Sequence, residues 1–250
     1  MSDILDRNKI LGQNSYLYDV KILENSASTQ KDAKADGQDN CLYLAENQTQ
    51  AYGRFGRAYF ASQGSGIYMS LLLKWPVSAD KMPNFTILAG AAIVSAIEKR
   101  TDKKLQIKWV NDIYLDGKKM AGILAEATVN ADNMEVIIGI GLNFSILEFP
   151  DELSDKATSL FTETAPTITR NELIAEIWNE FYSMMNADYF SIYKSHSFIL
   201  GRRISFDENQ IAYEGKAIDL TPEGELIVQL ANGQKKIISS GEISLKKWTD

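Results

Sequence analysis

The sequence is poor in the two side chains that most often bind zinc, since its 250 residues include one histidine, His196, and one cysteine, Cys41. A zinc site of the His/Cys type is therefore nearly excluded. A Ser-His-Asp triad would have to use His196, which has no nucleophile-elbow motif beside it. A single cysteine excludes an intramolecular disulfide and fits a reducing compartment. Cys41 lies in the apolar run CLYLA, which indicates a buried, inert thiol rather than a nucleophile.

Basic charge is also scarce, because 26 lysines and arginines stand against 33 aspartates and glutamates, giving a formal net charge of −7. A general nucleic-acid-binding protein usually carries a basic face, so this balance argues against that class. The N-terminus MSDILDRNKI lacks the basic and apolar regions of a signal peptide, and the longest apolar runs are shorter than a membrane span. We therefore expect a cytoplasmic protein with no nucleic-acid or membrane partner.

The order of apolar and polar segments predicts an α+β fold in two parts. Residues 1–198 alternate between strand-like and helix-like runs, from which we expect a large domain with a mixed β-sheet packed against helices. Residues 199–250 change to short strands separated by the turn pairs EG at 223–224, NG at 232–233 and SG at 240–241, which predicts a small β-barrel. The first residues, to about Tyr16, are polar, and we expect them to be poorly fixed.

A loop between two strand-like runs interrupts the hydrophobic pattern between Glu46 and Leu73. In the stretch AYGRFGRAYF it places Arg54 and Arg57 beside glycines and aromatic side chains. Glycines allow close backbone approach, guanidinium groups bind phosphate in a bidentate manner, and aromatic rings stack on a base. The loop would suit a flat anionic ligand, and a solvated turn is the competing interpretation.

A predicted hairpin over residues 106–127 is the second informative segment. Its turn is Asp116-Gly117, a pair typical of the type I′ turn. Lys118 and Lys119 follow on the return strand and must point to opposite faces, because side chains alternate along a strand, so at most one can face a site. Gly122 within that strand indicates close approach of a ligand or of another backbone segment. Asn111 and Asp112 precede the hairpin and would lie near the same lysine.

Ser28, Thr29 and Gln30 stand at the start of a predicted helix that Gly37 would close at its C′ position. The hydroxyl groups can simply cap this helix, which is the interpretation that the stretch alone favours. They can also present donors and acceptors to a polar ligand at the helix N-terminus.

The run MEVIIGIGLNFS at 134–145 predicts a strand buried on both faces, with Asn143 near its end. Its Gly139 and Gly141 lack the third glycine of a dinucleotide-binding fingerprint, and no P-loop motif occurs in the chain. A capping box of Thr169 with Glu172 then predicts the start of a helix whose apolar stripe is core packing.

Five segments resemble, in this order, those of the bacterial biotin–protein ligases, which attach biotin to carboxylase subunits. They are STQ at 28–30, ENQTQAYGRFGR at 46–57 beside the family's QxxGRGRRGR, KWVNDIYLDGKKMAGILAE at 108–126 beside KWPNDxYxxxKKxAGIL, IIGIGLNFS at 137–145, and SGEISL at 240–245. The resemblance covers residues 20–247. It implies a catalytic domain like that of biotin ligases and class II aminoacyl-tRNA synthetases over 1–198. It also implies an SH3-like barrel over 199–250, in a short form without the N-terminal DNA-binding repressor domain.

The resemblance implies a two-step reaction with biotin and ATP as substrates and Mg²⁺ as cofactor. The biotin carboxylate attacks the α-phosphate of ATP, giving biotinyl-5′-AMP and pyrophosphate, and a lysine amine of the acceptor then attacks the activated carbonyl. Such an enzyme must bring two anions together, spread charge on phosphorus and keep water from the mixed anhydride. The implied partner is the biotin carboxyl carrier protein of acetyl-CoA carboxylase or of another biotin-dependent carboxylase, and a homodimer is compatible with the family.

The same resemblance implies roles for individual residues. The catalytic residues are Lys119, Arg54 and Asp112, with Lys119 rather than Lys118 contacting the biotin carboxylate and the α-phosphate. The residues implied in biotin binding are Ser28, Thr29, Gln30, Gln48, Tyr52, Gly53, Arg54, Lys119, Gly122 and Leu124. Those implied in nucleotide binding are Asn111, Asn143, Tyr59, Arg57 and Gly141, and no metal ligand is assigned.

The chain departs from the family pattern at four positions. Ala51 replaces the first glycine of the loop motif, Tyr52 its first arginine, and Phe55 the second of its arginine pair. Val110 replaces the proline of KWPND. Arg54 and Lys119 remain, so we favour an active enzyme with a modified loop over an inactive homologue.

Other functions compete with this interpretation. A lipoate or octanoate transferase of the same broad fold would use a similar lysine, but its pocket would suit a long acyl chain rather than the polar set formed by Gln48 with residues 28–30. A non-catalytic biotin sensor is a further alternative, and the substitutions at Ala51 and Tyr52 in the loop motif are the only features that support it. A structural adaptor is the least supported, because polar residues gather at strand ends and loops.

Overall fold

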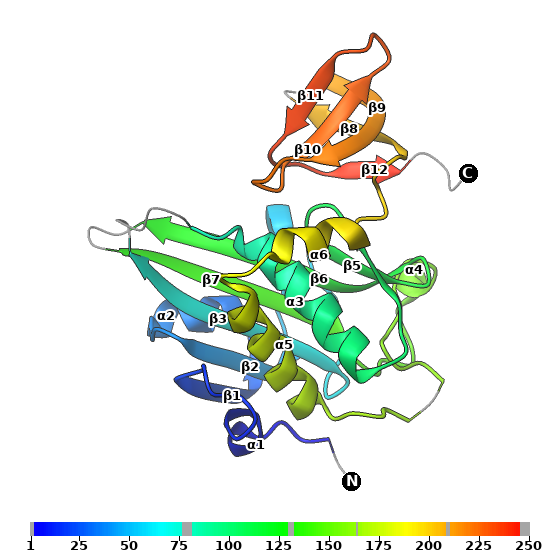
Figure 1. Cartoon of the computed structure of the whole chain (residues 1–250). Helices are drawn as coiled ribbons and strands as arrows, with labels where there is room; N and C mark the ends of the chain where they lie inside the picture. The colour runs from blue at the N-terminus through cyan, green and yellow to red at the C-terminus, as the bar shows by residue number, and fades with distance from the viewer. Residues whose placement is uncertain (1–2, 77–81, 130–132, 164, 209–210, 246–250) are drawn as a thin grey trace.

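A computed structural model describes residues 3–76, 82–129, 133–163, 165–208 and 211–245. The larger part of the fold is a seven-stranded mixed sheet with the order β1-β2-β3-β7-β6-β5-β4 (Figure 1). Its first two strands pair in parallel and the other neighbours pair antiparallel. The strands are β1 (Asp19–Ser26), β2 (Cys41–Gln48), β3 (Gly66–Pro76), β4 (Leu105–Lys108), β5 (Asp112–Leu115), β6 (Lys118–Val129) and β7 (Asn133–Asn143).

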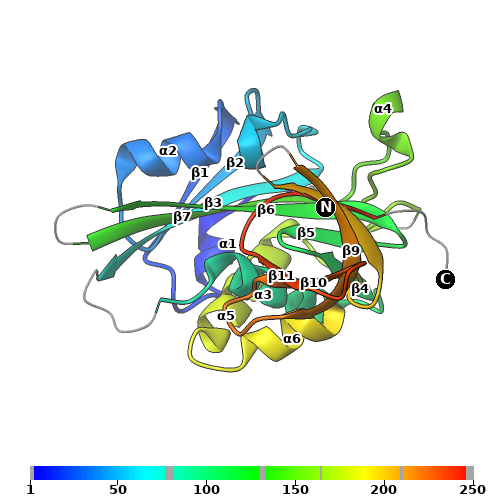
Figure 2. The same cartoon turned by 90° about the horizontal axis from the view of Figure 1, so that it is seen from above.

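Helices cover both faces of this sheet, which confirms the expected α+β class. Figure 2 shows α2 on one face and α3, α5 and α6 on the other. The helical segments are α1 (Arg7–Leu11), α2 (Thr29–Asp36), the short 3₁₀ segment η1 (Arg54–Gly56), α3 (Phe85–Arg100), α4 (Asp151–Ser154), α5 (Arg170–Met184) and α6 (Tyr189–His196). Within the described residues, no helix combines the length and the apolar character needed to cross a bilayer.

Local sequence signals account for where several of these elements begin. Asn84 caps α3 by accepting a hydrogen bond from the Ile87 N–H, and Thr169 and Glu172 form the predicted capping box of α5. The small residues of α3 allow close packing, since a Cβ added at Gly90 would lie 3.1 Å from the Tyr193 ring. The strand β3 is buried along most of its length, as its apolar sequence predicts. Cys41 is fully buried, and burial raises the pKa of its thiol.

The C-terminal strands form a second, antiparallel sheet with the order β11-β10-β9-β8-β12. They are β8 (Arg203–Glu208), β9 (Ile211–Leu220), β10 (Leu226–Leu230), β11 (Lys235–Ile238) and β12 (Ile243–Leu245), and in the part of the chain that is described the sheet stays open between β11 and β12. Gly224, Gly233 and Gly241 take positive φ at the predicted turns. The Trp109 indole donates to the carbonyl of Gly224 at 2.8 Å and joins this sheet to the larger one. Residues 1–2 and 246–250, at the ends of the two expected domains, lie outside the described residues.

The N-terminal segment is held in place, so the expectation that it is poorly fixed is wrong. Asp6 caps α1, and the side chain of Ile10 is fully buried. The reason lies far along the chain, in Arg170, whose side chain is 3% exposed. Its guanidinium forms an ion pair with Glu46 at 2.8 Å and donates to the Asp3 and Gly66 carbonyls. Arg170 thereby connects the N-terminal segment, the end of β2 and the start of β3 to α5.

Replacing Arg170 with Ala should therefore destabilise the whole fold. Removing one partner of a buried, hydrogen-bonded ion pair costs about 3–5 kcal/mol, and the partial exposure of Glu46 reduces our expectation to about 2–4 kcal/mol. Urea unfolding would measure the loss. Arg7→Ala, which breaks the exposed ion pair to Asp19, is the matched control, for which we expect about 0.5 kcal/mol or less. Equal effects of the two substitutions would contradict the anchoring role of Arg170.

Candidate active site

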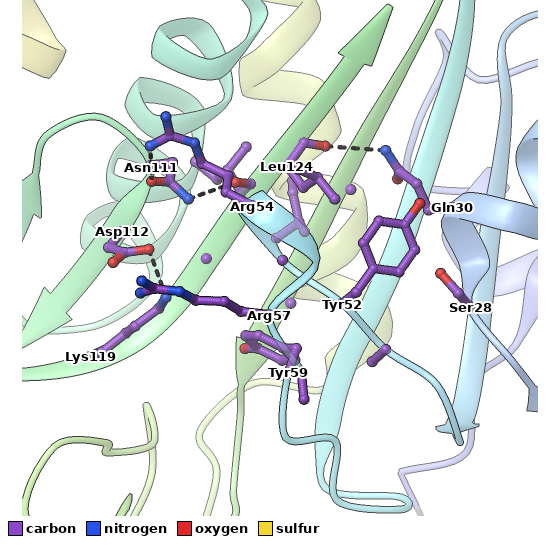
Figure 3. A pocket seen from close by; sticks show the side chains of 18 of the residues that line it. Ser28, Gln30, Tyr52, Arg54, Arg57, Tyr59, Asn111, Asp112, Lys119 and Leu124 are labelled. Atoms are coloured by element: carbon purple, nitrogen blue, oxygen red, sulfur yellow. Dashed lines mark hydrogen bonds and ion pairs between the residues drawn. The ribbon is translucent and has the colours of Figure 1, made fainter. Parts of the chain in front are cut away.

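A pocket of about 370 Å³ opens on the α2 side of the sheet, beneath the loop that connects β2 to β3. Its walls come from the start of α2, this loop, the strands β3 to β7 and the turn before β12. Figure 3 shows the charged side chains on one side of the pocket and Ser28, Gln30 and Tyr52 on the other. Segments distant in the sequence therefore meet in one concave, polar site.

A buried hydrogen-bond network forms one end of the pocket. Gln48 Oε1 accepts from the Thr29 N–H at 2.8 Å, and Thr29 Oγ1 lies 2.8 Å from Ser70 Oγ. Ser70 donates to Gln30 Oε1 at 2.9 Å, and Gln30 Nε2 donates to the Ile137 carbonyl at 3.1 Å. Ser28 occupies the N-cap position of α2 but makes no capping hydrogen bond with its side chain, so the simple capping interpretation is wrong for this residue. Its buried side chain lines the pocket instead.

Three glycines on β6 and β7 make room for neighbouring side chains. A Cβ at Gly139 would lie 2.6 Å from Gln30 Oε1, and one at Gly141 would lie 2.6 Å from the ring of Tyr59. A Cβ at Gly122 would lie 3.3 Å from the Lys119 ammonium group. Each glycine therefore permits a close approach, and Tyr59 packs directly over the β7 backbone.

The hairpin between β5 and β6 directs one lysine into the pocket, as the alternation of side chains predicts. Asp116 and Gly117 both take positive φ, 50° and 78°, in agreement with the expected type I′ turn. Lys119 Nζ lies 2.7 Å from Asp112 Oδ1 and lines the pocket. Lys118 instead donates to the Ser154 carbonyl at 2.9 Å, outside the pocket.

The arginine loop is held by groups from the turn before β5 and from the turn before β12. Arg54 Nη1 donates to Asn111 Oδ1 at 3.3 Å and to the Gly241 carbonyl at 3.2 Å. Arg57 forms an ion pair with Glu242 at 2.5 Å. The C-terminal sheet thus contributes directly to the wall of the pocket beside the two arginines.

The substituted loop positions have definite conformations. Ala51 has no positive φ, so the absence of a glycine there causes no backbone strain. Phe55, in place of an arginine, takes a φ of 59° and is 68% exposed, with its ring beside the Arg54 guanidinium. Tyr52 donates through its hydroxyl to Glu126 Oε2 on β6 at 3.0 Å. Burial and this hydrogen bond raise the pKa of Tyr52 to about 12.

The pocket brings together every predicted site residue except Asn143. Asn143 is buried at the end of β7, where the segment after α4 covers it and its amide donates to the Thr158 carbonyl at 3.0 Å. Asn143 lies only two residues beyond Gly141 on the same strand, so the sequence pattern places both in the site. The segment that covers Asn143 comes from another part of the chain, and the pattern of β7 alone does not predict it. The roles of all these residues remain predictions.

The sequence reasoning missed several polar residues of the pocket, among them Ser70, Lys108 and Glu242. Ser70 interrupts the apolar run IYMSLLL, a signal that could have identified it. Lys108 pairs with Asp112 across β4 and β5, and its pKa is lowered by burial and by Lys119, against the opposing effects of Asp112 and Glu242. Lys108 and Glu242 lie within segments that the resemblance does cover, but spacing alone does not show that both face the pocket.

Comparisons with known proteins agree on one family. Residues 23–143 match the Biotin/lipoate A/B protein ligase family, and residues 199–246 match the Biotin protein ligase C terminal domain. The bifunctional ligase/repressor BirA of Bacillus subtilis is 33% identical over 249 residues, which cover 94% of this chain and 75% of that protein. The biotin–[acetyl-CoA-carboxylase] ligase of Mycobacterium tuberculosis is 25% identical, with 95% and 92% covered.

A solved structure with the same fold supports this grouping. Biotin protein ligase from Aquifex aeolicus in complex with biotin and ATP superposes with a TM-score of 0.77 at 26% identity, covering 92% of this chain and all of that one. The mixed sheet packed with helices and the antiparallel C-terminal sheet are thus the architecture of that structure as well.

The fit between Gly139 and Gln30 yields a prediction about stability. Gly139→Ala should force the Gln30 amide away from Ser70 and Ile137, because the added Cβ would overlap its oxygen. Leaving buried polar groups unpaired costs about 1–3 kcal/mol, which denaturant unfolding would detect. Gly53→Ala is the control, since a Cβ there meets no atom closer than 3.9 Å, and it should change stability by about 0.5 kcal/mol or less. A neutral Gly139→Ala substitution would show that the network is not rigid.

Proposed function

The chain belongs to the biotin protein ligase family, and we propose that it activates biotin with ATP and transfers it to a lysine of a biotin carboxyl carrier protein. One observation carries the proposal: Lys119 lines the pocket on the same side as the two arginines of the loop, and a buried amide and hydroxyl network forms the other side (Figure 3). Such an arrangement provides a polar end for a neutral head group, a cation for a carboxylate, and further cations for phosphates.

The buried network suits the head group of biotin. A ureido ring offers a carbonyl acceptor and two N–H donors, and Ser28, Thr29, Gln30 and Gln48 supply both kinds of partner within one small region. The apolar part of the ligand would then run beside Leu124 and Gly122 toward Lys119. In this orientation the carboxylate of biotin arrives at the ammonium group of Lys119.

In the first step, a biotin carboxylate oxygen forms a bond to the α-phosphorus of ATP as the bond from that phosphorus to pyrophosphate breaks. Repulsion between the two anions opposes this approach, and the cations of Lys119 and Arg54 reduce it. Asn111, Arg57, Tyr59 and Gly141 lie on the same side of the pocket and are assigned to the nucleotide. The segment after α4 covers Asn143, so we assign this residue to packing at the end of β7 rather than to contact with the nucleotide.

Magnesium would enter with the nucleotide rather than occupy a preformed cage. The described residues contain no cluster of three or more acidic, histidine or cysteine side chains suited to a metal ion. Mg²⁺ is usually bound through one or two carboxylates together with substrate phosphates, and Asp112 is the pocket carboxylate that fits this role. When bound, the ion neutralises charge on the phosphates.

In the second step, the amine of the acceptor lysine attacks the biotin carbonyl, and AMP leaves. Asp112 is the residue assigned to orient this amine and to receive its proton, which requires that its ion pair with Lys119 loosen when ligand is bound. We propose the carrier protein of acetyl-CoA carboxylase or of another biotin-dependent carboxylase as the acceptor. A homodimer and a cytoplasmic location remain predictions.

Incubation with biotin, ATP, Mg²⁺ and a purified acceptor domain would test the proposal, with the mass of the acceptor as the readout. We expect the acceptor to gain the mass of one biotinyl group. A gain with lipoate but not with biotin would identify the lipoate transferase alternative. Biotin binding without release of pyrophosphate would identify a sensor.

Lys119→Ala should abolish formation of the adenylate while the protein remains folded, because the substitution removes the charge closest to the new phosphorus–oxygen bond. We expect a loss of at least about 100-fold in pyrophosphate release, as is common when one transition-state contact to a developing charge is removed. Lys118→Ala is the matched control, since the neighbouring lysine points out of the pocket. Similar rates for the two variants would refute the assignment of Lys119.

A further inference from the structure

The loop over the pocket is a compact flap that is closed by its own backbone. Tyr52 and Ala58 form a β-bridge, and the Gly53 N–H donates to the Arg57 carbonyl at 2.8 Å. The Tyr59 N–H donates to the Ala51 carbonyl at 3.0 Å. Because these bonds connect the two sides of residues 51–59, a contact made by one flap residue restrains the whole segment.

One such contact joins the flap to the strand that borders the biotin end of the pocket. The Tyr52 hydroxyl donates to Glu126 Oε2 at 3.0 Å. Glu126 lies two residues beyond Leu124 on β6, and side chains two apart on a strand share a face. Leu124 and Tyr52 line the pocket, so this hydrogen bond fastens the flap to β6 at the edge of the pocket wall. Figure 3 shows Tyr52 beside Gln30, on the opposite side of the pocket from Lys119.

We propose that Tyr52 and Glu126 form a latch that holds the flap over the acyl end of the bound adenylate. This inference rests on the proposed function. Tyr52 stands where the family pattern has an arginine, so the chain fastens its flap with a neutral donor and a carboxylate instead of relying on a guanidinium at that position.

The chemistry of the pair suits a latch that does not need ligand. A carboxylate oxygen accepts hydrogen bonds, and a phenol that stays protonated near neutral pH is always available as the donor. The high pKa of Tyr52 meets this condition. A closed flap limits the access of water to the mixed anhydride and slows its escape, so both residues act as positioning residues.

The release rate of the adenylate tests the latch directly. The full chain is loaded with biotin and ATP in the presence of pyrophosphatase, without acceptor, and the appearance of free biotinyl-AMP is followed. Tyr52→Phe and Glu126→Ala should each speed release by about 3- to 10-fold, the loss expected for one hydrogen bond. The double variant should release no faster than either single variant, because both remove the same bond. Glu126→Gln keeps an acceptor oxygen and should fall between the parent and Glu126→Ala.

The control is Tyr18→Phe, which removes a hydroxyl from a tyrosine that is 71% exposed and absent from the pocket lining. It should release the adenylate at the parent rate. Release from Tyr52→Phe at the parent rate, or additive effects in the double variant, would overturn the latch.

Hydrogen exchange of the ligand-free protein tests the same bond without any chemistry. Amides of residues 51–59 should exchange faster in Tyr52→Phe than in the parent, while Tyr18→Phe leaves them unchanged. If the parent produces no pyrophosphate, the proposed function fails, and exchange still decides whether the flap is latched. Unchanged exchange in Tyr52→Phe would show that the hydroxyl does not hold the flap.

Discussion

The buried hydrogen-bond network at the start of α2 is the constraint on which the pocket depends. Thr29, Gln30, Gln48 and Ser70 come from a helix and two strands; Thr29, Gln30 and Ser70 are buried, and Gln48 is half-buried. Buried polar groups are costly unless they are paired, so these side chains hold α2 in one position on the sheet. The network also requires a glycine at position 139, because any Cβ there would displace the Gln30 side chain.

The charged end of the pocket follows from strand register. The tight turn at Asp116-Gly117 opposes Tyr114 to Lys119, and a register shift between Tyr114 and Ile113 then opposes Asp112 to Gly122. With this register Lys119 meets Asp112, and Lys118 points away. Glu242 and the carbonyl of Gly241, from the turn before β12, reach the two arginines of the flap. The small sheet is therefore part of the pocket wall, and the flap is held between two sheets that are far apart in the sequence.

Local features were predictable because neighbouring residues create them. The capping box of α5, the hairpin turn, the buried strand β3 and the opposite directions of Lys118 and Lys119 all depend on residues only a few positions apart. The resemblance to biotin–protein ligases was recognisable for the same reason, since it rests on short motifs in a fixed order. The family matches over residues 23–143 and 199–246 agree with it.

Local patterns of residues were enough to predict the class of fold, the turns, the helix caps and the set of residues that could form a site. Which of these residues meet depends on contacts between distant segments. Arg170 fixes a polar N-terminus through Asp3, 167 residues away, and no local pattern contains that contact. Asn143 is withdrawn from the pocket by a covering segment, whereas Lys108 and Glu242 are brought into it. Local structure depends on nearby residues, but a pocket depends on how whole strands, helices and loops pack, and packing is a property of the entire chain.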